Sequence, residues 1–345
     1  MSAQRVLVTG GSGFIAGHCI LQLLGRGYSV RTTVRSLERE AVVRSVLAAA
    51  GVSDGADLSF VAADLLSDAG WPEAVAGCDV VLHIASPVAP GGVKDENDVI
   101  LPARDGTLRV LRAARDAGVR RLVLTSSFHS VAWGHPHDRG RTFTEADWGV
   151  VDGPGMDAYG KSKTLAERAA WDFVAAQAGA LELTTILPTA VMGPVMGPQI
   201  SGSNGLVQRI LDGALPGYLN LFFPIVDVRD VAAAHVAALD AEGAAGERFL
   251  VSGDPAISMK QVGEILRERL GDAAPHLLTR SIPDFVVRFG ALFSAEFRPV
   301  VPNLGHARQA SNAKARRVLG FEPRPAEESI VDTARSLIAQ RLVRS

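Results

Sequence analysis

The sequence predicts an α/β protein in which a doubly wound parallel sheet is joined to a smaller, mostly helical C-terminal part. Short apolar runs rich in β-branched residues alternate with helical patterns as far as about residue 255, which is typical of βαβ units. A glycine turn at residues 10–13 joins the first strand to the first helix without a gap. Beyond residue 255 amphipathic helices replace the strands. The 345 residues suffice for two closely associated domains or one enlarged domain.

Composition indicates a globular protein and excludes several kinds of partner. Hydrophobic residues make up 47% of the chain and charged residues 21%, and the formal net charge is -2. We therefore expect no binding to nucleic acid or membrane, and no apolar run reaches spanning length. The chain begins almost directly with a strand, which leaves no room for a signal peptide. With Cys19 and Cys78 as its two cysteines, the chain fits a reducing compartment, and we predict a cytoplasmic protein. His135 and His137 lie in a loop punctuated by glycine and proline, where we expect no metal site.

The first strand-turn-helix unit predicts a nucleotide site. Residues 5–9 form an apolar strand, and residues 14–24 form a buried helix that stops at Gly25. Between them, Gly10 permits a tight turn, Gly13 lets the backbone approach a phosphate, and the helix N-terminus offers unpaired N–H groups. Ala16 holds the third small position of this fingerprint. We predict a Rossmann-type fold in which a dinucleotide contacts Gly10, Ser12, Gly13, Phe14 and Ile15.

The second strand, at residues 28–35, predicts which dinucleotide binds. Sites for NAD place an acidic residue at the end of this strand, whereas an arginine there suits the 2'-phosphate of NADP. Arg35 holds this place, Ser36 follows it, and Arg39 lies one helical turn further on. A solvated arginine in a loop is the alternative. We favour NADP(H) as the cofactor.

The next two strands contribute further candidate cofactor contacts. The third strand and its exit, at residues 58–65, place Asp64 and Leu65 beside the adenine. The fourth, at residues 79–87, ends in Ala85, Ser86 and Pro87, small residues at the point where the cofactor would cross the sheet edge. His83 lies within the apolar run and is interpreted as a core histidine rather than a catalyst. A helical pattern between residues 97 and 118 follows, interrupted near Pro102.

The fifth strand, at residues 121–127, ends in hydroxyl groups. Ligands bind at the carboxyl edge of a doubly wound sheet, so a serine there could donate a hydrogen bond to a substrate oxygen as negative charge develops. Ser126 and Ser127 are neighbouring candidates. Hydroxyls that merely close off a strand end are the alternative.

Tyr159 and Lys163 are the candidate catalytic pair. They are one turn apart in a segment that we expect to be helical from residue 159 to about residue 178, so their side chains project from one face. A tyrosine hydroxyl titrates near pKa ~10, and a neighbouring ammonium favours its phenolate. We expect Lys163 to lower the pKa of Tyr159 in this way. An isolated pair of this spacing is usually an amphipathic surface pair, so the assignment depends on the surrounding motifs.

The rest of the chain predicts a cover over this site. A sixth strand at residues 181–187 leads into a loop at 188–194, from which Pro188, Thr189 and Val191 could cover the nicotinamide. Residues 195–223 lose the βα rhythm around a helix at 206–211, as in a substrate lid. Residues 226–231 open a helix, and residues 247–251 form the last strand.

We predict that residues 1–190, with 227–254 returning to them, form the NADP-binding domain, and that 191–226 and 255–345 form the substrate-binding part. Helices are expected at 259–270 with a Ser258 cap, at 312–319 and at 326–337. The apolar side chains between these helices are expected to pack in the core, with a pocket wall or an interface as alternatives; they are Phe285, Phe289, Leu292, Phe293 and Phe297. A candidate apolar substrate pocket comprises Phe128, Trp133, Met192, Leu206 and Phe222, although each alone is more typical of a core.

Together these motifs resemble the extended short-chain dehydrogenase/reductases. The likeness covers residues 5–255 and rests on TGGSGFIAG at 9–17, TVRS at 33–36, DVVLHIASP at 79–87, VLTSS at 123–127, YGKSK at 159–163 and DVRDVAAAH at 227–235. It is nearest to the branch of dihydroflavonol 4-reductases, cinnamoyl-CoA reductases and yeast-type NADPH-dependent aldehyde and methylglyoxal reductases. By this resemblance Ser127, Tyr159 and Lys163 fall on the family's catalytic triad, and Arg35 falls on its 2'-phosphate contact.

The resemblance implies an NADPH-dependent reductase of aldehydes or ketones that forms monomers or homodimers and acts on small molecules. Cinnamoyl-CoA reductases carry an Asn-Trp-Tyr-Cys run before the tyrosine, whereas residues 155–158 here read Gly-Met-Asp-Ala, which argues against acyl-CoA reduction. Two alternatives stay open: an NAD(P)-dependent nucleotide-sugar epimerase or dehydratase, and a non-catalytic redox sensor that binds NADP(H).

Overall fold

A parallel sheet forms the centre of the computed structural model, which describes residues 4–87, 95–136, 138, 140–177, 179, 181–200, 202–253, 255–293 and 297–344. Within these ranges the sheet has seven strands in the order β11-β7-β5-β4-β1-β2-β3, all parallel to their neighbours. Strand order reverses at β1, which lies between β2 and β4, and this switch point is where doubly wound sheets bind ligands. The predicted fold class is confirmed. The strands are β1 (Arg5–Val8), β2 (Ser29–Val34), β3 (Leu58–Ala62), β4 (Val80–His83), β5 (Arg121–Thr125), β7 (Glu182–Pro188) and β11 (Arg248–Val251).

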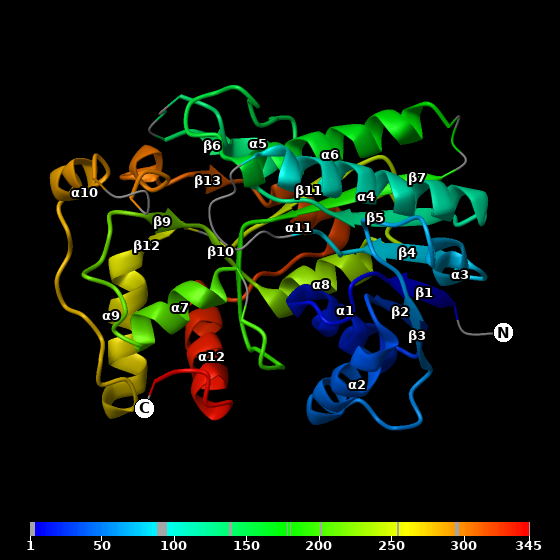
Figure 1. Ribbon diagram of the computed structural model, residues 1–345, viewed down its shortest axis with the longest axis horizontal. Helices are drawn as coiled ribbons and strands as arrows, with labels where there is room; N and C mark the ends of the chain where they lie inside the picture. Colours follow the sequence, from blue (N-terminus) through cyan, green and yellow to red (C-terminus); the bar gives the residue numbers. More distant parts are fainter. Residues whose placement is uncertain are drawn as a thin grey trace.

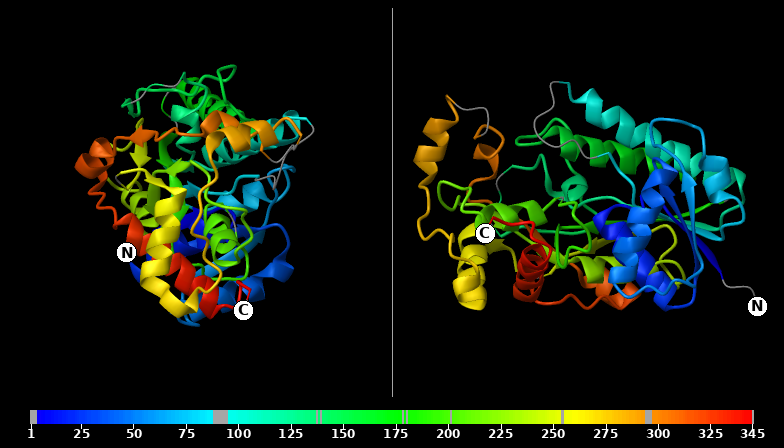
Figure 2. Two further views of the ribbon diagram at one scale, coloured as in Figure 1. Left: turned by 90° about the vertical axis from the view of Figure 1, so that its left-hand side faces the viewer. Right: turned by 60° about the horizontal axis from the view of Figure 1, so that its bottom comes forward.

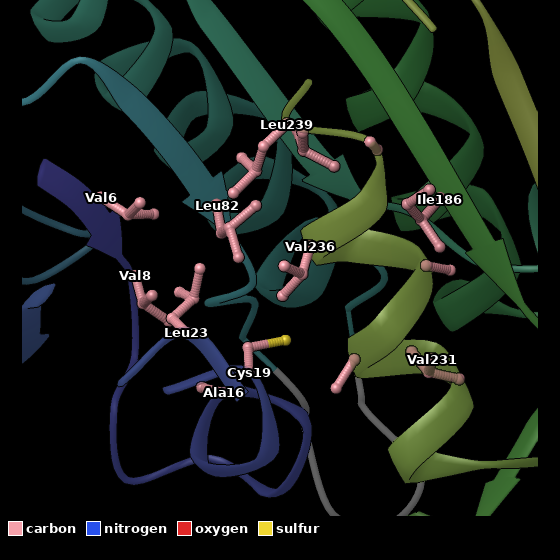
Figure 3. Close-up of a cluster of buried hydrophobic side chains, with 14 of the residues drawn as sticks. Val6, Val8, Ala16, Cys19, Leu23, Leu82, Ile186, Val231, Val236 and Leu239 are labelled. Atoms are coloured by element: carbon pink, nitrogen blue, oxygen red, sulfur yellow. The ribbon is translucent and has the colours of Figure 1, made fainter. Parts of the chain in front are cut away.

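Helices cover both faces of the sheet (Figure 1). The helices α3 (Trp71–Val75), α4 (Asn97–Asp116) and α6 (Ala158–Ala175) lie on one face, and α1 (Phe14–Gly25), α2 (Glu40–Ala49) and α8 (Val228–Ala237) lie on the other. Side chains alternate along β1, so Val6 and Val8 pack towards α1 and α8 while Leu7 packs towards α4. Figure 3 shows the first of these clusters, with Cys19 and Leu23 of α1 facing Val231 and Val236 of α8.

The prediction that Pro102 interrupts a helix is wrong. The helix α4 runs continuously through Pro102, which lies near its N-terminal end. Pro102 is the sixth residue of α4, so the helix loses one N–H donor in its second turn, and the buried side chains of Val99, Ile100 and Ala103 hold the helix on both sides of it.

Three pairs of short strands lie outside the main sheet in the described ranges. The strand β8 (Ala190–Met192) pairs with β10 (Ile225–Asp227), β9 (Phe222–Phe223) pairs with β12 (Ile257–Ser258), and β6 (Thr142–Phe143) pairs with β13 (Gln309–Ala310). The prediction of a loop at 188–194 therefore missed a strand, and the helix expected from residue 226 begins at 228. Strands this short show no readable alternation, and their partners are distant in sequence.

The C-terminal part is mostly helical, as predicted. The helices α7 (Asn204–Leu211), α9 (Met259–Leu270) and α12 (Ala326–Ala339) lie beside the sheet (Figure 2) and share a separate hydrophobic cluster. Ser258 caps α9 in a capping box with Gln261, which confirms the predicted cap. The helix α11 (Ala313–Leu319) packs instead with the sheet, since Ala315 and Leu319 join the cluster of α1 and α8. The proposed division into two domains stays a prediction.

The expectation that the apolar side chains between residues 285 and 297 pack in the core is wrong for four of the five, and the fifth, Phe297, is half-buried. Phe285, Phe289, Leu292 and Phe293 are 64–77% exposed. The helix α10 (Asp284–Gly290) is short and lies at the edge of the molecule (Figure 1), where Val287 alone of its residues is buried. The remaining short helices are α5 (His129–Ala132) and the 3₁₀ turns η1 (Leu37–Arg39), η2 (Gly271–Ala273) and η3 (Val301–Asn303). No helix in the described ranges is long and apolar enough to cross a membrane.

Candidate active site

The glycine turn after β1 leads into a helix whose N-terminus has no side-chain cap. Gly10 has φ 73°, which favours glycine, and a Cβ there would lie 3.1 Å from the Cβ of Ala85. The Gly10 N–H donates to Thr33 Oγ1 at 2.9 Å, which fixes the turn against β2. Gly13 forms the N-cap of α1 without any side-chain cap, so the first N–H groups of α1 are left for an anion. Ser12 is exposed, and Phe14 and Ile15 are half-buried behind it.

The other candidate cofactor residues follow the ends of neighbouring strands. Arg35 is exposed directly after β2. Asp64 follows β3, and its Oδ1 accepts a hydrogen bond from Leu66 N at 2.9 Å, which shapes the loop that carries Leu65. Ala85, Ser86 and Pro87 are half-buried after β4, where Thr9 Oγ1 accepts hydrogen bonds from Ile84 N and Ala85 N at 3.0 and 2.9 Å. All of these residues lie at the carboxyl edge of the sheet, and this set fits a dinucleotide that carries a 2'-phosphate.

The two serines after β5 point to different partners. Ser126 Oγ donates to Glu167 Oε2 at 2.6 Å and lies 3.2 Å from Ser130 Oγ. Ser127 instead lies within hydrogen-bonding reach of the Tyr159 phenol. Its Oγ accepts a hydrogen bond from the backbone N–H of His129 at 3.2 Å. This arrangement favours Ser127 over Ser126 as the residue that contacts a substrate.

Tyr159 and Lys163 lie one turn apart at the start of α6, as expected. Asp157 caps the helix by accepting the Gly160 N–H at 2.7 Å. Lys163 Nζ lies 5.8 Å from the centre of the Tyr159 ring. Burial lowers the pKa of Lys163 to about 8, against an opposing effect from the Glu167 carboxylate. A cavity of about 10 Å³ beside Lys163, lined also by Thr107 and Ser126, has room for about one water molecule.

The expectation that Lys163 lowers the pKa of Tyr159 is wrong for this structure. Burial raises the pKa of Tyr159, the hydrogen bond with Ser127 acts in the opposite direction, and the Asp157 carboxylate adds to the rise. Burial disfavours the charged phenolate, and the hydrogen bond with Ser127 offsets only part of this effect. Tyr159 is therefore protonated at neutral pH, which is the state that a proton donor needs.

A ring stack that the sequence analysis missed lies beside this pair. The His129 ring stacks on Trp133 with centres 3.6 Å apart and meets the Tyr159 ring edge-on at 4.9 Å. The Arg308 guanidinium lies 4.2 Å from the centre of the Trp133 ring. Burial lowers the pKa of His129 to about 3, with Arg308 and then Lys163 adding to this effect, so the imidazole is neutral. Only the helical spacing of residues 129 and 133 could have indicated part of this stack.

A buried charge network, which the sequence analysis also missed, lies next to Lys163. Glu167 lies one turn beyond Lys163 and pairs with Arg248 of β11 through Arg248 Nε at 2.7 Å. It also accepts hydrogen bonds from Ser130 Oγ at 2.6 Å and Thr185 Oγ1 at 3.0 Å. The spacing of Lys163 and Glu167 could have revealed the carboxylate, but nothing local reveals Arg248.

The structure places the candidate pocket residues in different surroundings. Phe128 and Met192 are buried in two different hydrophobic clusters, so they present no surface to a ligand here. Trp133 is half-buried in the ring stack. Leu206 packs at the edge of the C-terminal cluster, and Phe222 lies half-buried in β9. The structure thus brings Trp133 to the candidate catalytic residues and places Met192 in the core, because β8 is a paired strand rather than a loop.

The remaining cover residues and one of the two loop histidines are also placed. Pro188 and Thr189 are buried at the end of β7, and Val191 is half-buried in β8. His135 Nε2 lies 3.1 and 3.0 Å from the carbonyls of Val131 and Trp148, a structural position. His137 and the predicted helix end at 178 lie outside the described residues. In the described part of the chain, no three metal-ligating side chains gather.

Comparison with known proteins places the chain in a family. Residues 6–252 match the NAD dependent epimerase/dehydratase family. The chain is 34% identical over 346 residues to a cinnamoyl-CoA reductase of Medicago truncatula, covering 96% of this chain and 95% of that relative. Among solved structures it is similar to the yeast methylglyoxal/isovaleraldehyde reductase Gre2 complexed with NADPH, with a TM-score of 0.81 and 28% identity over 98% of this chain and 99% of that one. Gre2 of Candida albicans, also with NADPH, matches with a TM-score of 0.81 and 26% identity over the same shares.

These relatives are oxidoreductases, and they confirm both the predicted resemblance and the predicted enzyme class. The match spans the whole parallel sheet, from β1 to β11, together with the glycine turn and the helix of Tyr159 and Lys163. The chain belongs to the NAD dependent epimerase/dehydratase family.

Proposed function

We propose that this protein is an NADPH-dependent reductase that converts an aldehyde or ketone to an alcohol. The observation that carries the proposal is the grouping of Ser127, Tyr159 and Lys163 at the carboxyl edge of the sheet, beside an uncapped helix N-terminus. Relatives of the same fold whose crystal structures contain NADPH support the cofactor. A cytoplasmic location and the oligomeric state stay predictions.

The cofactor residues have separate roles in this proposal. The turn from Gly10 to Gly13 and the start of α1 bind the pyrophosphate, and Arg35 binds the 2'-phosphate. Asp64 and Leu65 lie beside the adenine. Ala85, Ser86 and Pro87 on one side, with Pro188, Thr189 and Val191 on the other, position the nicotinamide. NADPH, when bound, supplies the hydride.

Tyr159 protonates the oxygen of the substrate carbonyl as it becomes an alkoxide. Its raised pKa keeps the phenol protonated at neutral pH. Ser127 donates a second hydrogen bond to the same oxygen, where negative charge develops. Lys163 holds the nicotinamide ribose through its ammonium, which keeps the cofactor beside Tyr159.

Two rival functions are less well supported. A nucleotide-sugar epimerase would share the tyrosine and lysine, but such enzymes mostly pair NAD with an acidic residue after β2, and Arg35 stands there. A redox sensor would need no proton donor, yet Tyr159 is present beside Ser127. Measuring turnover with NADPH against NADH separates the first rival from a reductase.

Replacing Tyr159 by Phe tests the proposal. Tyr159→Phe removes the proton donor, so NADPH oxidation with an aldehyde should fall by about 10²- to 10⁴-fold while NADPH still binds, as followed by fluorescence titration. Tyr28→Phe is the matched control. The Tyr28 hydroxyl contacts Asp240, and Tyr28 lies just before β2, at the amino edge of the sheet and away from the candidate site. Near-normal turnover in Tyr159→Phe, or no NADPH oxidation by the unaltered protein with any carbonyl compound, would refute the proposal.

A further inference from the structure

Arg308 comes to the active site from the C-terminal part of the chain. It lies between η3 and β13, and β13 pairs with β6 close to α5 (Figure 1). The same segment packs on the loop before α6, because a Cβ at Gly155, where φ is 72°, would lie 3.0 Å from Pro302 Cβ. Gly155, the first residue of the stretch where the chain departs from cinnamoyl-CoA reductases, therefore faces the segment that carries Arg308.

A short series of ring contacts links Arg308 to the proposed proton donor. The guanidinium lies over Trp133, Trp133 stacks on His129, and His129 meets Tyr159 edge-on. The rings have an apolar surface, and His129 is neutral. Arg308 therefore supplies the positive charge at the end of this series that lies away from Tyr159.

The charge of Arg308 has no carboxylate partner in the described part of the chain. Its Nη1 donates to Asn303 Oδ1 at 3.1 Å, a neutral acceptor. Burial lowers the pKa of Arg308 to about 10, so it stays charged at neutral pH, and the Asp157 carboxylate acts from a distance in the opposite direction. Asp157 Oδ1 already caps α6 by accepting the Gly160 N–H.

An unpaired, half-buried guanidinium costs free energy, and a bound anion would offset that cost. Guanidinium groups present paired N–H donors that match a carboxylate. A purely neutral substrate would gain little from this charge. The side chain is thus better suited to a ligand group than to the protein around it.

We propose that Arg308 binds a carboxylate on the substrate, so that the natural substrate is a carbonyl compound with an acidic group at its far end. The proposal rests on the proposed reductase function and names its substrate class. Since three rings lie in series from Tyr159 to Arg308, the carboxylate and the carbonyl should be separated by an aromatic ring or a chain of similar length.

A matched pair of aldehydes tests this inference. 4-Carboxybenzaldehyde carries the acidic group across one ring from the carbonyl, and methyl 4-formylbenzoate has almost the same shape without the charge. The measurement is kcat/KM for NADPH oxidation with each aldehyde, expressed as the acid-to-ester ratio. Arg308→Met keeps a stem over Trp133 and removes the charge, Arg308→Lys keeps a charge, and Arg298→Met is the control, an exposed arginine that donates to Ala291 O.

The expected result is an acid-to-ester ratio above one that falls by about 10- to 100-fold in Arg308→Met, the loss typical of a charge-assisted hydrogen bond. Arg308→Lys should recover part of the ratio, and Arg298→Met should leave both rates unchanged. An unaltered ratio in Arg308→Met, or a preference of the unaltered protein for the ester, overturns the inference but leaves the reductase function standing. No NADPH oxidation with any carbonyl compound would overturn both.

Discussion

Arg248 and Arg308 both stack on tryptophan rings, yet they lie in opposite electrostatic surroundings. Arg248 lies 3.6 Å from the centre of the Trp148 ring and pairs with the fully buried Glu167 carboxylate. Its Nη1 also donates to the carbonyls of Glu145 and Asp147 at 2.6 and 2.9 Å. Arg308 lies 4.2 Å from the Trp133 ring and donates to the neutral side chain of Asn303.

The difference shows that stacking on an aromatic ring does not by itself reveal what an arginine does. The donors of Arg248 are used within the protein, so its charge is compensated and its role is structural. Arg308 retains donors and charge at the end of the ring series that lies away from Tyr159. A structural arginine and a ligand-binding arginine therefore differ in the hydrogen bonds and ion pairs that each forms within the protein, and the ring contact does not distinguish them.

Removing the compensated arginine should have the largest effect. Arg248→Met leaves the Glu167 carboxylate buried without its counter-charge, so the free energy of unfolding should fall by about 3–5 kcal/mol. Urea denaturation followed by circular dichroism measures this change. A loss below about 1 kcal/mol would mean that Glu167 is compensated in another way.

Replacing both partners distinguishes a lost attraction from an orphaned charge. Adding Glu167→Leu to Arg248→Met removes the unpaired carboxylate, so part of the lost stability should return. The recovery should be incomplete, because Ser130 and Thr185 also donate to Glu167 and would lose their acceptor. A double variant less stable than Arg248→Met would contradict this explanation.

The same comparison explains how much could be predicted from sequence. The fold, the glycine turn and the spacing of Tyr159 and Lys163 depend on residues close together in the chain, and local periodicity reveals them. Arg248 and Arg308 meet partners that lie 81 and more than 150 residues away, and no local pattern records such contacts. The pairing of β8 with β10 and the burial of Met192 were missed for the same reason.

Burial also overturned one electrostatic expectation. The spacing of Tyr159 and Lys163 indicated a lowered tyrosine pKa, but a sequence does not show how deeply a phenol is buried, and desolvation dominates here. The choice between Ser126 and Ser127 likewise depends on Glu167, which binds the first serine and leaves the second to face Tyr159.

The pH dependence of turnover sharpens the comparison between the two arginines. Lys163 has a pKa of about 8, so it is an ammonium below that pH and an amine above it. The ammonium is the form proposed to hold the nicotinamide ribose, so kcat/KM for carbonyl reduction should fall above about pH 8, approaching about tenfold per pH unit. Assays of NADPH oxidation across pH 6–10 measure this fall, the alkaline limb of the plot of kcat/KM against pH.

Glu167 and Arg308 should affect that limb differently. The Glu167 carboxylate raises the pKa of Lys163, so Glu167→Gln should move the fall in kcat/KM to lower pH. Arg308 is not among the groups that shift Lys163, so Arg308→Met should leave the position of the limb unchanged. A limb that stays in place in Glu167→Gln would show that a group other than Lys163 controls the rate.

The smallest effect is expected for stability when Arg308 itself is changed. Arg308→Met removes a cation over the Trp133 ring and one hydrogen bond to Asn303, without leaving a buried carboxylate unpaired. Relief of the half-buried charge offsets these losses, so the free energy of unfolding should change by no more than about 1 kcal/mol, far less than for Arg248→Met in the same urea titration. Should the two variants lose equal stability, Arg308 would be a structural arginine like Arg248, and its unpaired charge would need an explanation within the fold rather than in a ligand.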